Sequence, residues 1–236
     1  MRRLFALVAL AALAAFATGA AAQTPAYPPA ADEPLHIVRH RSAAFLIYTN
    51  HIAPGMWTQF HSHRNDLLAM IAADTRAASQ KPDAPIDVQR APAGAAVFFP
   101  YADATTAFVH RVGVEGDAPF VNVGLEFLEA PAGQCAQHAP WQSVEAAPVA
   151  RNRRGFAYRL SLPAGHAAAL PAQGRGLLIV PLPASGEVAD LALDGARWQA
   201  AAGDFRFFDA TQNATRAQRL HNAGATAQAV ALFVAC

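Results

Sequence analysis

The chain repeats its own framework residues at a nearly constant spacing, and this duplication constrains the fold more than any other feature. At a shift of 110 residues the matches are an aromatic residue, a glycine and a leucine pair: Tyr48 with Tyr158, Gly55 with Gly165, and Leu67-Leu68 with Leu177-Leu178. At shifts of 109 and 108 the matches continue: 94–99 (GAAVFF) with 203–208 (GDFRFF), Arg111 with Arg219, and Gly116 with Gly224. Ordered matches with so little drift predict two repeats, near 44–129 and 155–235.

Each repeat has the pattern of a β-structure. Segments rich in Val, Phe, Tyr and Thr alternate with Gly, Pro and Asp, and no long helical pattern is present. The candidate strands of the first repeat are 44–52, 57–63, 67–72, 95–99, 106–114 and 119–128. Short strands separated by turn signals predict an all-β chain made of sandwiches or barrels.

The segments outside the repeats carry targeting and linker signals. Residues 1–22 have a positive start, an apolar run and a small-residue end, which predicts a cleaved signal peptide. The apolar run is too short for a confident membrane span. We therefore expect a periplasmic or secreted protein, with 23–35 as a disordered, proline-rich tail and 130–154 as a linker.

Charge and cysteine content limit the partners. Removing Arg2 and Arg3 with the signal leaves 18 − 2 = 16 basic residues against 17 acidic ones. This balance gives no electrostatic reason to expect nucleic acid or an anionic membrane as a partner. Cys135 and Cys236 could pair in an oxidising compartment, or they could be two free thiols in flexible segments.

The stretch GMWTQFHSH (55–63) places His61 and His63 one residue apart. Side chains alternate along a strand, so both imidazoles lie on one face and could bind one cation. The second repeat lacks the candidate ligands: in the alignment of the two repeats, Pro171 and Gln173 occupy the positions of His61 and His63, and Gln218 occupies the position of His110. Histidines confined to one repeat favour a site there over chance placement.

These residues resemble the motifs of the cupin superfamily, whose members are jelly-roll β-barrels. Gly55, His61 and His63 match the start of the first motif, G-x5-H-x-H-x3/4-E. Gly94 and Pro100 have the opening spacing of the second motif, G-x5-P-x-G-x2-H-x3-N, and His110 is similar to its histidine. The run 110–119 (HRVGVEGDAP) also resembles the end of such barrels.

The resemblance implies two tandem cupin-type jelly-roll barrels, at 36–129 and 155–236, the second one degenerate. It also implies a site of His61, His63 and His110 for a divalent transition metal: Zn, Fe, Mn, Ni or Cu. The glutamate of the first motif is missing, since Leu67 and Leu68 stand there and Asp66 is one residue early. The alternative is a barrel that has lost its metal and keeps histidines satisfied by hydrogen bonds.

Other residues have simpler interpretations. Gln59 is either an outer hydrogen-bond partner of the site or an ordinary polar residue, and Trp57 packs beside it. Arg151, Arg153 and Arg154 form a basic cluster that we expect to be a solvated hinge. The remaining histidines lack ligand spacing, and we expect most of them to be exposed or capping: His36, His40, His51, His138, His166 and His221.

Three hypotheses for function follow. The chain is a metal-dependent enzyme acting on a small metabolite, similar to cupin dioxygenases or isomerases; a metal- or ligand-binding module without catalysis; or a structural protein. The sequence contains no phosphate-binding glycine loop and no convincing nucleophile, so no catalytic residue is assigned. A homodimer is a family-level expectation.

Overall fold

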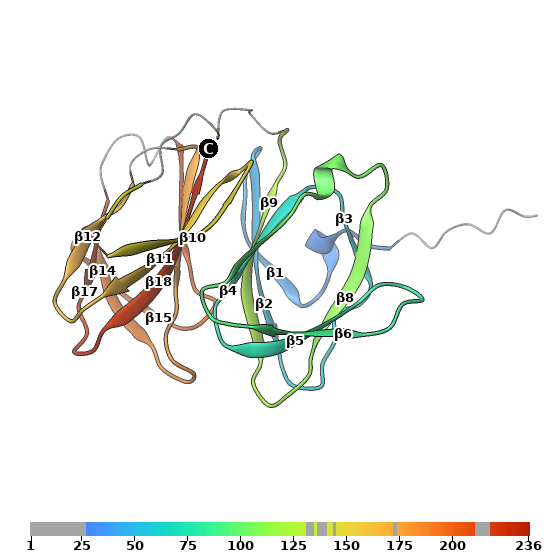
Figure 1. Ribbon diagram of the computed structural model, residues 1–236, viewed down its shortest axis with the longest axis horizontal. Coiled ribbons are helices and arrows are strands. Elements are labelled where there is room, and N and C mark those ends of the chain that lie inside the picture. Colours follow the sequence, from blue (N-terminus) through green and yellow to red (C-terminus); the bar gives the residue numbers. More distant parts are fainter. Residues whose placement is uncertain (1–26, 131–134, 136–140, 144, 172–173, 211–217) are drawn as a thin grey trace, which may run out of the picture.

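Two β-barrels lie side by side, each made of a five-stranded and a four-stranded antiparallel sheet (Figure 1). The computed structural model describes residues 27–130, 135, 141–143, 145–171, 174–210 and 218–236. The first barrel contains η1 (Ala30–Asp32), β1 (His36–Arg41), β2 (Phe45–Ile52), β3 (His61–His63), β4 (Asp66–Ile71), β5 (Thr75–Gln80), β6 (Asp87–Ala91), β7 (Ala96–Phe99), η2 (Tyr101–Asp103), β8 (Phe108–Val114) and β9 (Phe120–Phe127). The second contains β10 (Ala146–Asn152), β11 (Gly155–Leu162), β12 (Ala167–Ala169), β13 (Gly176–Pro181), β14 (Ala189–Leu193), β15 (Ala196–Ala200), β16 (Arg206–Asp209), β17 (Arg219–Asn222) and β18 (Gln228–Ala235).

The two barrels have the same topology. The large sheets run β1-β2-β9-β4-β7 and β10-β11-β18-β13-β16, and the small sheets run β3-β8-β5-β6 and β12-β17-β14-β15. Registers agree as well, because Tyr48 pairs with Gly124 on β9 and Tyr158 pairs with Leu232 on β18. The all-β class and the duplication are confirmed.

The large sheets pack face to face and form one core between the barrels. On β2, Phe45 and Ile47 point toward the other barrel, whereas Tyr48 points into its own. The shared core also contains Ala157 and Phe233 of the second barrel. Strand alternation therefore gives each large sheet two buried faces, so the two barrels bury each other's large sheets.

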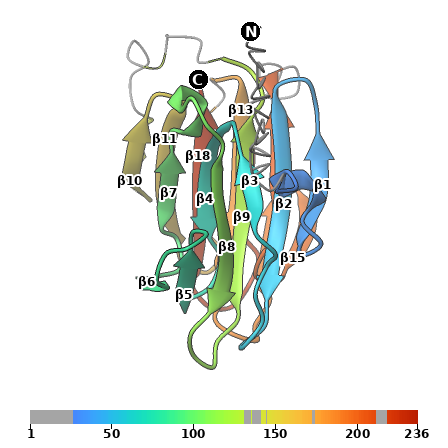
Figure 2. The ribbon, with the colours of Figure 1, turned by 90° about the vertical axis from the view of Figure 1, so that its right-hand side faces the viewer.

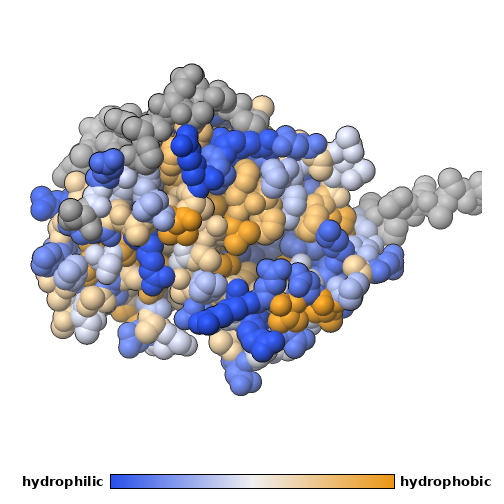
Figure 3. Space-filling view, viewed as in Figure 1, coloured by the Kyte–Doolittle hydropathy of each residue, from blue (hydrophilic) through white to orange (hydrophobic). Residues whose placement is uncertain are grey.

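This packing leaves the small sheet β3-β8-β5-β6 on the side of the first barrel away from the second (Figures 1 and 2). Along the seam, β7 contacts β10, and Val97 and Val149 on these strands are exposed. Figure 3, in the view of Figure 1, shows apolar surface in the middle of the molecule, where the two barrels meet.

Two expectations about the connecting segments are wrong. Residues 27–35, expected to lie in a disordered tail, pack on the first barrel, where Ala30 and Glu33 are each 2% exposed. Residues 146–152, expected to lie in the linker, form β10 and pair with β11. Both segments lie at sheet edges and are ordered by contacts with distant parts of the chain. Such contacts produce no periodic hydrophobic pattern in the local sequence. Strand 57–63 is also shorter than expected, because regular structure covers only His61–His63.

A disulfide joins Cys135 to Cys236, with 5.1 Å between their Cα atoms. Of the two alternatives left open for these thiols, the structure therefore has the bridge. Within the described ranges, no helix is long and apolar enough to cross a membrane. The expected signal peptide, 1–22, lies outside the described residues.

Candidate metal centre

Three histidines meet inside the first barrel because β3 and β8 are neighbours. His61 and His110 are directly opposite each other in the antiparallel ladder, and His63 lies two residues along the same face. One ligand nitrogen from each of the three lies within 4.8 Å of the others. His61 and His63 are buried and His110 is half-buried. Strand pairing thus brings His110 next to His61 and His63, which precede it in the chain by 49 and 47 positions.

Glu126 on β9 orients His63. Its Oε1 accepts a hydrogen bond from His63 Nδ1 at 2.9 Å, and its Oε2 accepts one from Asn65 Nδ2 at 3.1 Å. Because Nδ1 carries the proton, the lone pair of His63 is on Nε2. That atom lies 3.1 Å from Nε2 of His110. Two nitrogens bound at about 2.1 Å and a right angle around one ion would be about 3 Å apart.

His61 supplies the observation most specific to a metal. Its Nδ1 donates to the backbone carbonyl of Gln59 at 2.9 Å, so its Nε2 carries a lone pair. That Nε2 is buried and has no hydrogen-bond partner in the structure. An unsatisfied buried polar atom costs about 1–3 kcal/mol, which a bound cation would remove. The residues therefore fit a divalent metal held by three Nε2 atoms.

Each ligand imidazole also has an outer partner for its second nitrogen. Gln59 supplies a carbonyl, Glu126 a carboxylate, and Ser79 a hydroxyl 3.3 Å from Nδ1 of His110. Such partners fix the ring orientation, and the carbonyl and the carboxylate, which can only accept, also fix the tautomers of His61 and His63.

Burial favours the neutral form of two of the imidazoles, His61 and His110. It lowers the pKa of His61 to about 4, with nearby His63 adding to the effect and the hydrogen bond to Gln59 opposing it. Burial likewise lowers the pKa of His110 well below its usual range, and His63 and His61 lower it further. Neutral imidazole is the form that binds metals, so the lowered pKa values of His61 and His110 favour metal binding by these two rings at neutral pH.

A fourth imidazole, His36 on β1, lies beside the three. It stacks on Tyr48 at 4.5 Å between ring centroids and meets the ring of His61 edge-on at 4.6 Å. Burial lowers the pKa of His36 to about 3. The expectation that His36 is exposed or capping is therefore wrong: it is 5% exposed and lines the centre.

Asp66 is not part of this centre. Its two oxygens accept hydrogen bonds from Arg153, from Arg154 Nε at 2.6 Å and from the Ala102 amide at 3.1 Å. Burial raises the pKa of Asp66, but the hydrogen bonds from both arginines outweigh it and leave the pKa below its usual value. Asp66 thus joins the first barrel to the β10–β11 hairpin.

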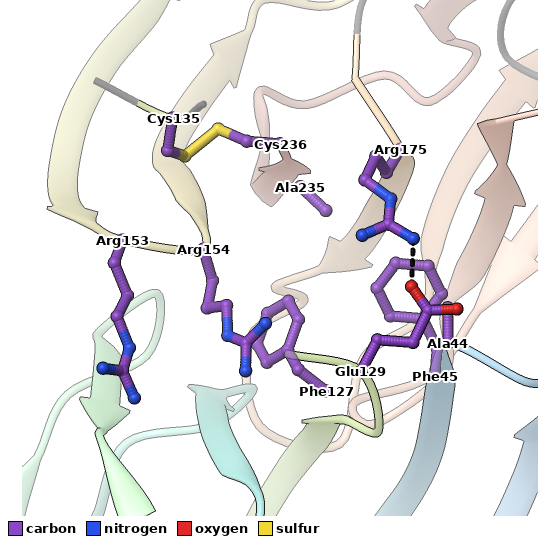
Figure 4. Close-up of a pocket in the computed structure, with 10 residues that line it drawn as sticks. All are labelled: Ala44, Phe45, Phe127, Glu129, Cys135, Arg153, Arg154, Arg175, Ala235 and Cys236. Carbon is purple, nitrogen blue, oxygen red and sulfur yellow. Dashed lines mark hydrogen bonds and ion pairs between the residues drawn. A yellow bond between two sulfur atoms is a disulfide. The ribbon is translucent and has the colours of Figure 1, made fainter. Parts of the chain in front are cut away.

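Two members of the basic cluster, Arg153 and Arg154, are consequently interface residues and not part of a solvated hinge, whereas Arg151 is exposed. Arg154 is 6% exposed, and Arg153 also pairs with Asp103. Figure 4 shows both side chains projecting from the hairpin into a small pocket that the disulfide and the Arg175–Glu129 pair also line.

Trp57 packs as expected, and Gln59 contributes to the centre through its backbone alone. The side chain of Gln59 is exposed, and its backbone contacts His61. The ring of Trp57 packs on Gly113, where a Cβ atom would lie 2.3 Å from it, and the Arg111 guanidinium lies 4.7 Å from its centroid. Trp57 is a packing residue on the sheet.

Comparison with known proteins identifies the fold. No family model matches the chain, and no curated protein matches it. AerE from Microcystis aeruginosa is 10% identical over 86% of this chain and 98% of its own, with a TM-score of 0.54. Salicylate 1,2-dioxygenase from Pseudoaminobacter salicylatoxidans, in a structure of its adducts with gentisate, is 10% identical over 82% and 68%, with a TM-score of 0.50. A cupin 2 conserved barrel domain protein from Leptotrichia buccalis is 9% identical over 85% and 88%, with a TM-score of 0.49. The chain has the cupin fold.

The second cupin barrel keeps this framework without the polar interior. The strand equivalent to β3 is β12, which is three alanines. At four further equivalent ladder positions the second barrel carries apolar residues: Ala146 for His36, Leu160 for Asn50, Val230 for Asn122, and Val234 for Glu126. Within the described parts of both cupin barrels, the three histidines are the one group of His, Cys, Asp or Glu close enough to hold an ion.

Sequence reasoning missed Glu126, Ser79 and His36. Glu126 had a detectable signal, because Asn122, Gly124 and Glu126 alternate with apolar residues along β9. That period predicts one polar face on a core strand. Ser79 and His36 lie on strands that were not expected, so nothing local placed them near the histidines.

Proposed function

We propose that this chain is an exported cupin whose N-terminal barrel binds a divalent transition metal through His61, His63 and His110. The observation that carries the proposal is the buried, unpartnered Nε2 of His61, which points to a missing partner among three converging imidazoles. Since the second barrel has an apolar interior, its role is to cover the large sheet of the first.

Imidazole ligands suit Zn, Fe, Mn, Ni and Cu, so the ligand set does not select one metal. A metal held by three protein ligands keeps positions for water or a small ligand and supplies Lewis-acid or oxygen-activating chemistry there. The chain's own part is orientation, because Glu126, Gln59 and Ser79 fix the three rings. The aromatic rings of Tyr101 and Phe108 pack against His63 and His110.

Elemental analysis of tag-free protein tests the proposal. Wild type is expected to contain, or to rebind after reconstitution, about one metal per chain, because one three-histidine set holds one ion. The double variant His61→Ala/His63→Ala is expected to contain none. A double variant of two exposed histidines, His51→Ala/His166→Ala, controls for adventitious binding. Wild type that cannot be loaded with any of the five metals would reject the proposal.

Catalysis is a second candidate function, favoured by one observation. Three protein ligands leave open coordination positions, unlike a structural site closed by four. Salicylate 1,2-dioxygenase shares the fold, and fold alone does not choose a reaction. Oxygen uptake by the metal-loaded protein across a panel of small metabolites, compared with the His61→Ala/His63→Ala variant, tests for an oxygenase.

Export is supported by the signal-like residues 1–22 and by the Cys135–Cys236 disulfide, because disulfides persist mainly in oxidising compartments. Fractionation of cells expressing the full chain tests it: the periplasmic or culture fraction should contain protein that begins near Gln23. Full-length protein retained in the cytoplasm would contradict export.

A further inference from the structure

The segment before β1 crosses the first barrel beside the histidines, and we call residues 27–33 the N-terminal strap. η1 lies within it, between β1 and β3 (Figure 2). The strap is rich in proline and alanine, which by composition favours disorder, yet Ala30 and Glu33 are buried. Its contacts concentrate on three places in the metal centre.

The first contact is with the free edge of β3. In its sheet β3 pairs only with β8, and the strap supplies partners on the other side. The Ser62 amide donates to the Pro28 carbonyl at 2.8 Å, and Pro29 forms a parallel bridge with Ser62. Ser62 lies between His61 and His63, so the strap holds the ligand strand from its open edge.

The second contact passes through a buried carboxylate. Glu33 Oε2 accepts a hydrogen bond from the backbone N–H of Gln59 at 3.0 Å, and its Oε1 accepts one from the backbone N–H of Leu35 at 3.2 Å. The carbonyl of the same Gln59 accepts from Nδ1 of His61. Glu33 therefore fixes the backbone that sets the direction of the His61 ring.

The third contact sets the tautomer of His36. Nδ1 of His36 lies 2.8 Å from the Ala30 carbonyl, which can only accept, so Nδ1 carries the proton. The edge-on contact between His36 and His61 then places an imidazole of defined tautomer beside the site.

From these contacts we infer that the N-terminal strap is a positioning element of the metal centre, with Glu33 as its principal residue. The inference rests on the proposed metal-binding function and deepens it. Docking of the strap fixes the conformation of Gln59–His63, and a bound metal requires the same conformation. Strap docking and metal binding therefore strengthen each other, and linkage requires the coupling to be equal in both directions.

Titration of Zn(II) against a competing chelator, in the full-length protein, tests the inference. Loss of a group that orients a ligand costs about 10- to 100-fold in metal affinity, so Glu33→Ala is expected to weaken Zn(II) binding by that factor. Glu33→Gln keeps one acceptor oxygen and should fall between wild type and Glu33→Ala. Glu187→Ala, an exposed glutamate of the second barrel, is the matched control and should bind as wild type.

Two readouts separate positioning from general stability. The visible spectrum of bound Co(II) reports ligand geometry and should change in Glu33→Ala but not in Glu187→Ala. Hydrogen exchange at the Ser62 amide of wild type should slow when Zn(II) is added, because the metal favours the docked strap. This measurement needs no variant and decides the matter if Glu33→Ala does not fold.

The outcomes of these tests are distinct. Zn(II) affinity and Co(II) spectrum unchanged in Glu33→Ala would overturn the strap while leaving the three-histidine site intact. Ser62 exchange unaffected by saturating Zn(II) would overturn it as well. A wild type that binds no Zn(II), Co(II) or other divalent metal would reject the proposed function itself.

Discussion

At the scale of single residues, Glu126 is the side chain whose role is easiest to isolate. Its hydrogen bond to His63 fixes the Nδ1–H tautomer and makes Nε2 a better ligand. We predict that Glu126→Gln weakens metal binding about 10- to 100-fold, as seen when outer partners of metal ligands are removed. Chelator competition measures this, with Glu129→Gln as control, since the exposed Glu129 carboxylate pairs with Arg175 and not with a histidine.

Protonation of the buried imidazoles makes metal-free stability depend on pH. The folded-state pKa values of His36 and His61, about 3 and about 4, lie below the unfolded value of 6.5. The unfolded chain therefore binds more protons between those values, and acid favours unfolding. We predict that the metal-free protein is fully stabilised above pH 6.5 and loses stability as pH falls toward 4. Urea unfolding at pH 7, 6, 5 and 4 measures this.

The same imidazoles give that experiment its control. The variant His36→Phe/His61→Phe removes both titrating rings and should show a flatter pH dependence over this window. A wild-type dependence as flat as that of the variant would contradict the assigned pKa shifts.

The candidate site shows what single residues reveal in a sequence. The H-x-H spacing predicted that His61 and His63 share a face, and the structure places His110 opposite His61. As metal ligands the three remain a prediction. Asp66 was a doubtful ligand by spacing alone, and its true partners, Arg153 and Arg154, are almost ninety residues away. Spacing encodes neighbours on one strand, not contacts between barrels.

At the scale of elements, strands that carry residues matched between the repeats were predictable, and largely exposed strands were not. β2 and β4 match β11 and β13 at a shift of 110, as the paired tyrosines and leucines indicated. The outer strands β1, β6 and β10 are largely exposed and lack period-two hydrophobicity, so propensity alone could not find them.

The Asp66 contact joins two elements, β4 and the β10–β11 hairpin, through a buried charge. Removing one partner of a buried pair leaves the other uncompensated. We predict that Asp66→Asn lowers the free energy of unfolding by about 3–5 kcal/mol, because Arg154 stays buried without its anion. Denaturant unfolding measures this.

Asp190→Asn is the matched control for that variant. Asp190 pairs with Arg197 on the surface of the second barrel, where solvent screens the ion pair, so Asp190→Asn should change the free energy of unfolding much less. Equal losses in the two variants would show that the buried contact does not hold the barrels together.

At the scale of the whole molecule, the duplication has separated scaffold from site. Both barrels keep the strand order and the apolar outer faces of the large sheets, since these faces form the shared core. The inward faces differ in polarity, as Glu126 against Val234 illustrates. Substitution on an inward face changes the barrel interior without disturbing the shared core, because strand alternation keeps the two faces independent.

The disulfide bridges the ends of the two units, and its removal tests how far stability and site are independent. Cys135 follows β9, and Cys236 follows β18, 101 residues later. Closing a loop of about 100 residues stabilises a fold by about 4.7 kcal/mol in the chain-entropy model, and engineered cases often give less. We predict that Cys135→Ser/Cys236→Ser loses about 2–5 kcal/mol of unfolding free energy.

Metal affinity should stay within twofold of wild type, because β3, β8 and β9 of the first barrel hold the site and its orienting carboxylate. Denaturation and chelator competition on the same preparation measure both quantities. A large loss of metal affinity in a variant that is still folded would show that the disulfide shapes the centre across the interface, and the two barrels would then act as one functional unit.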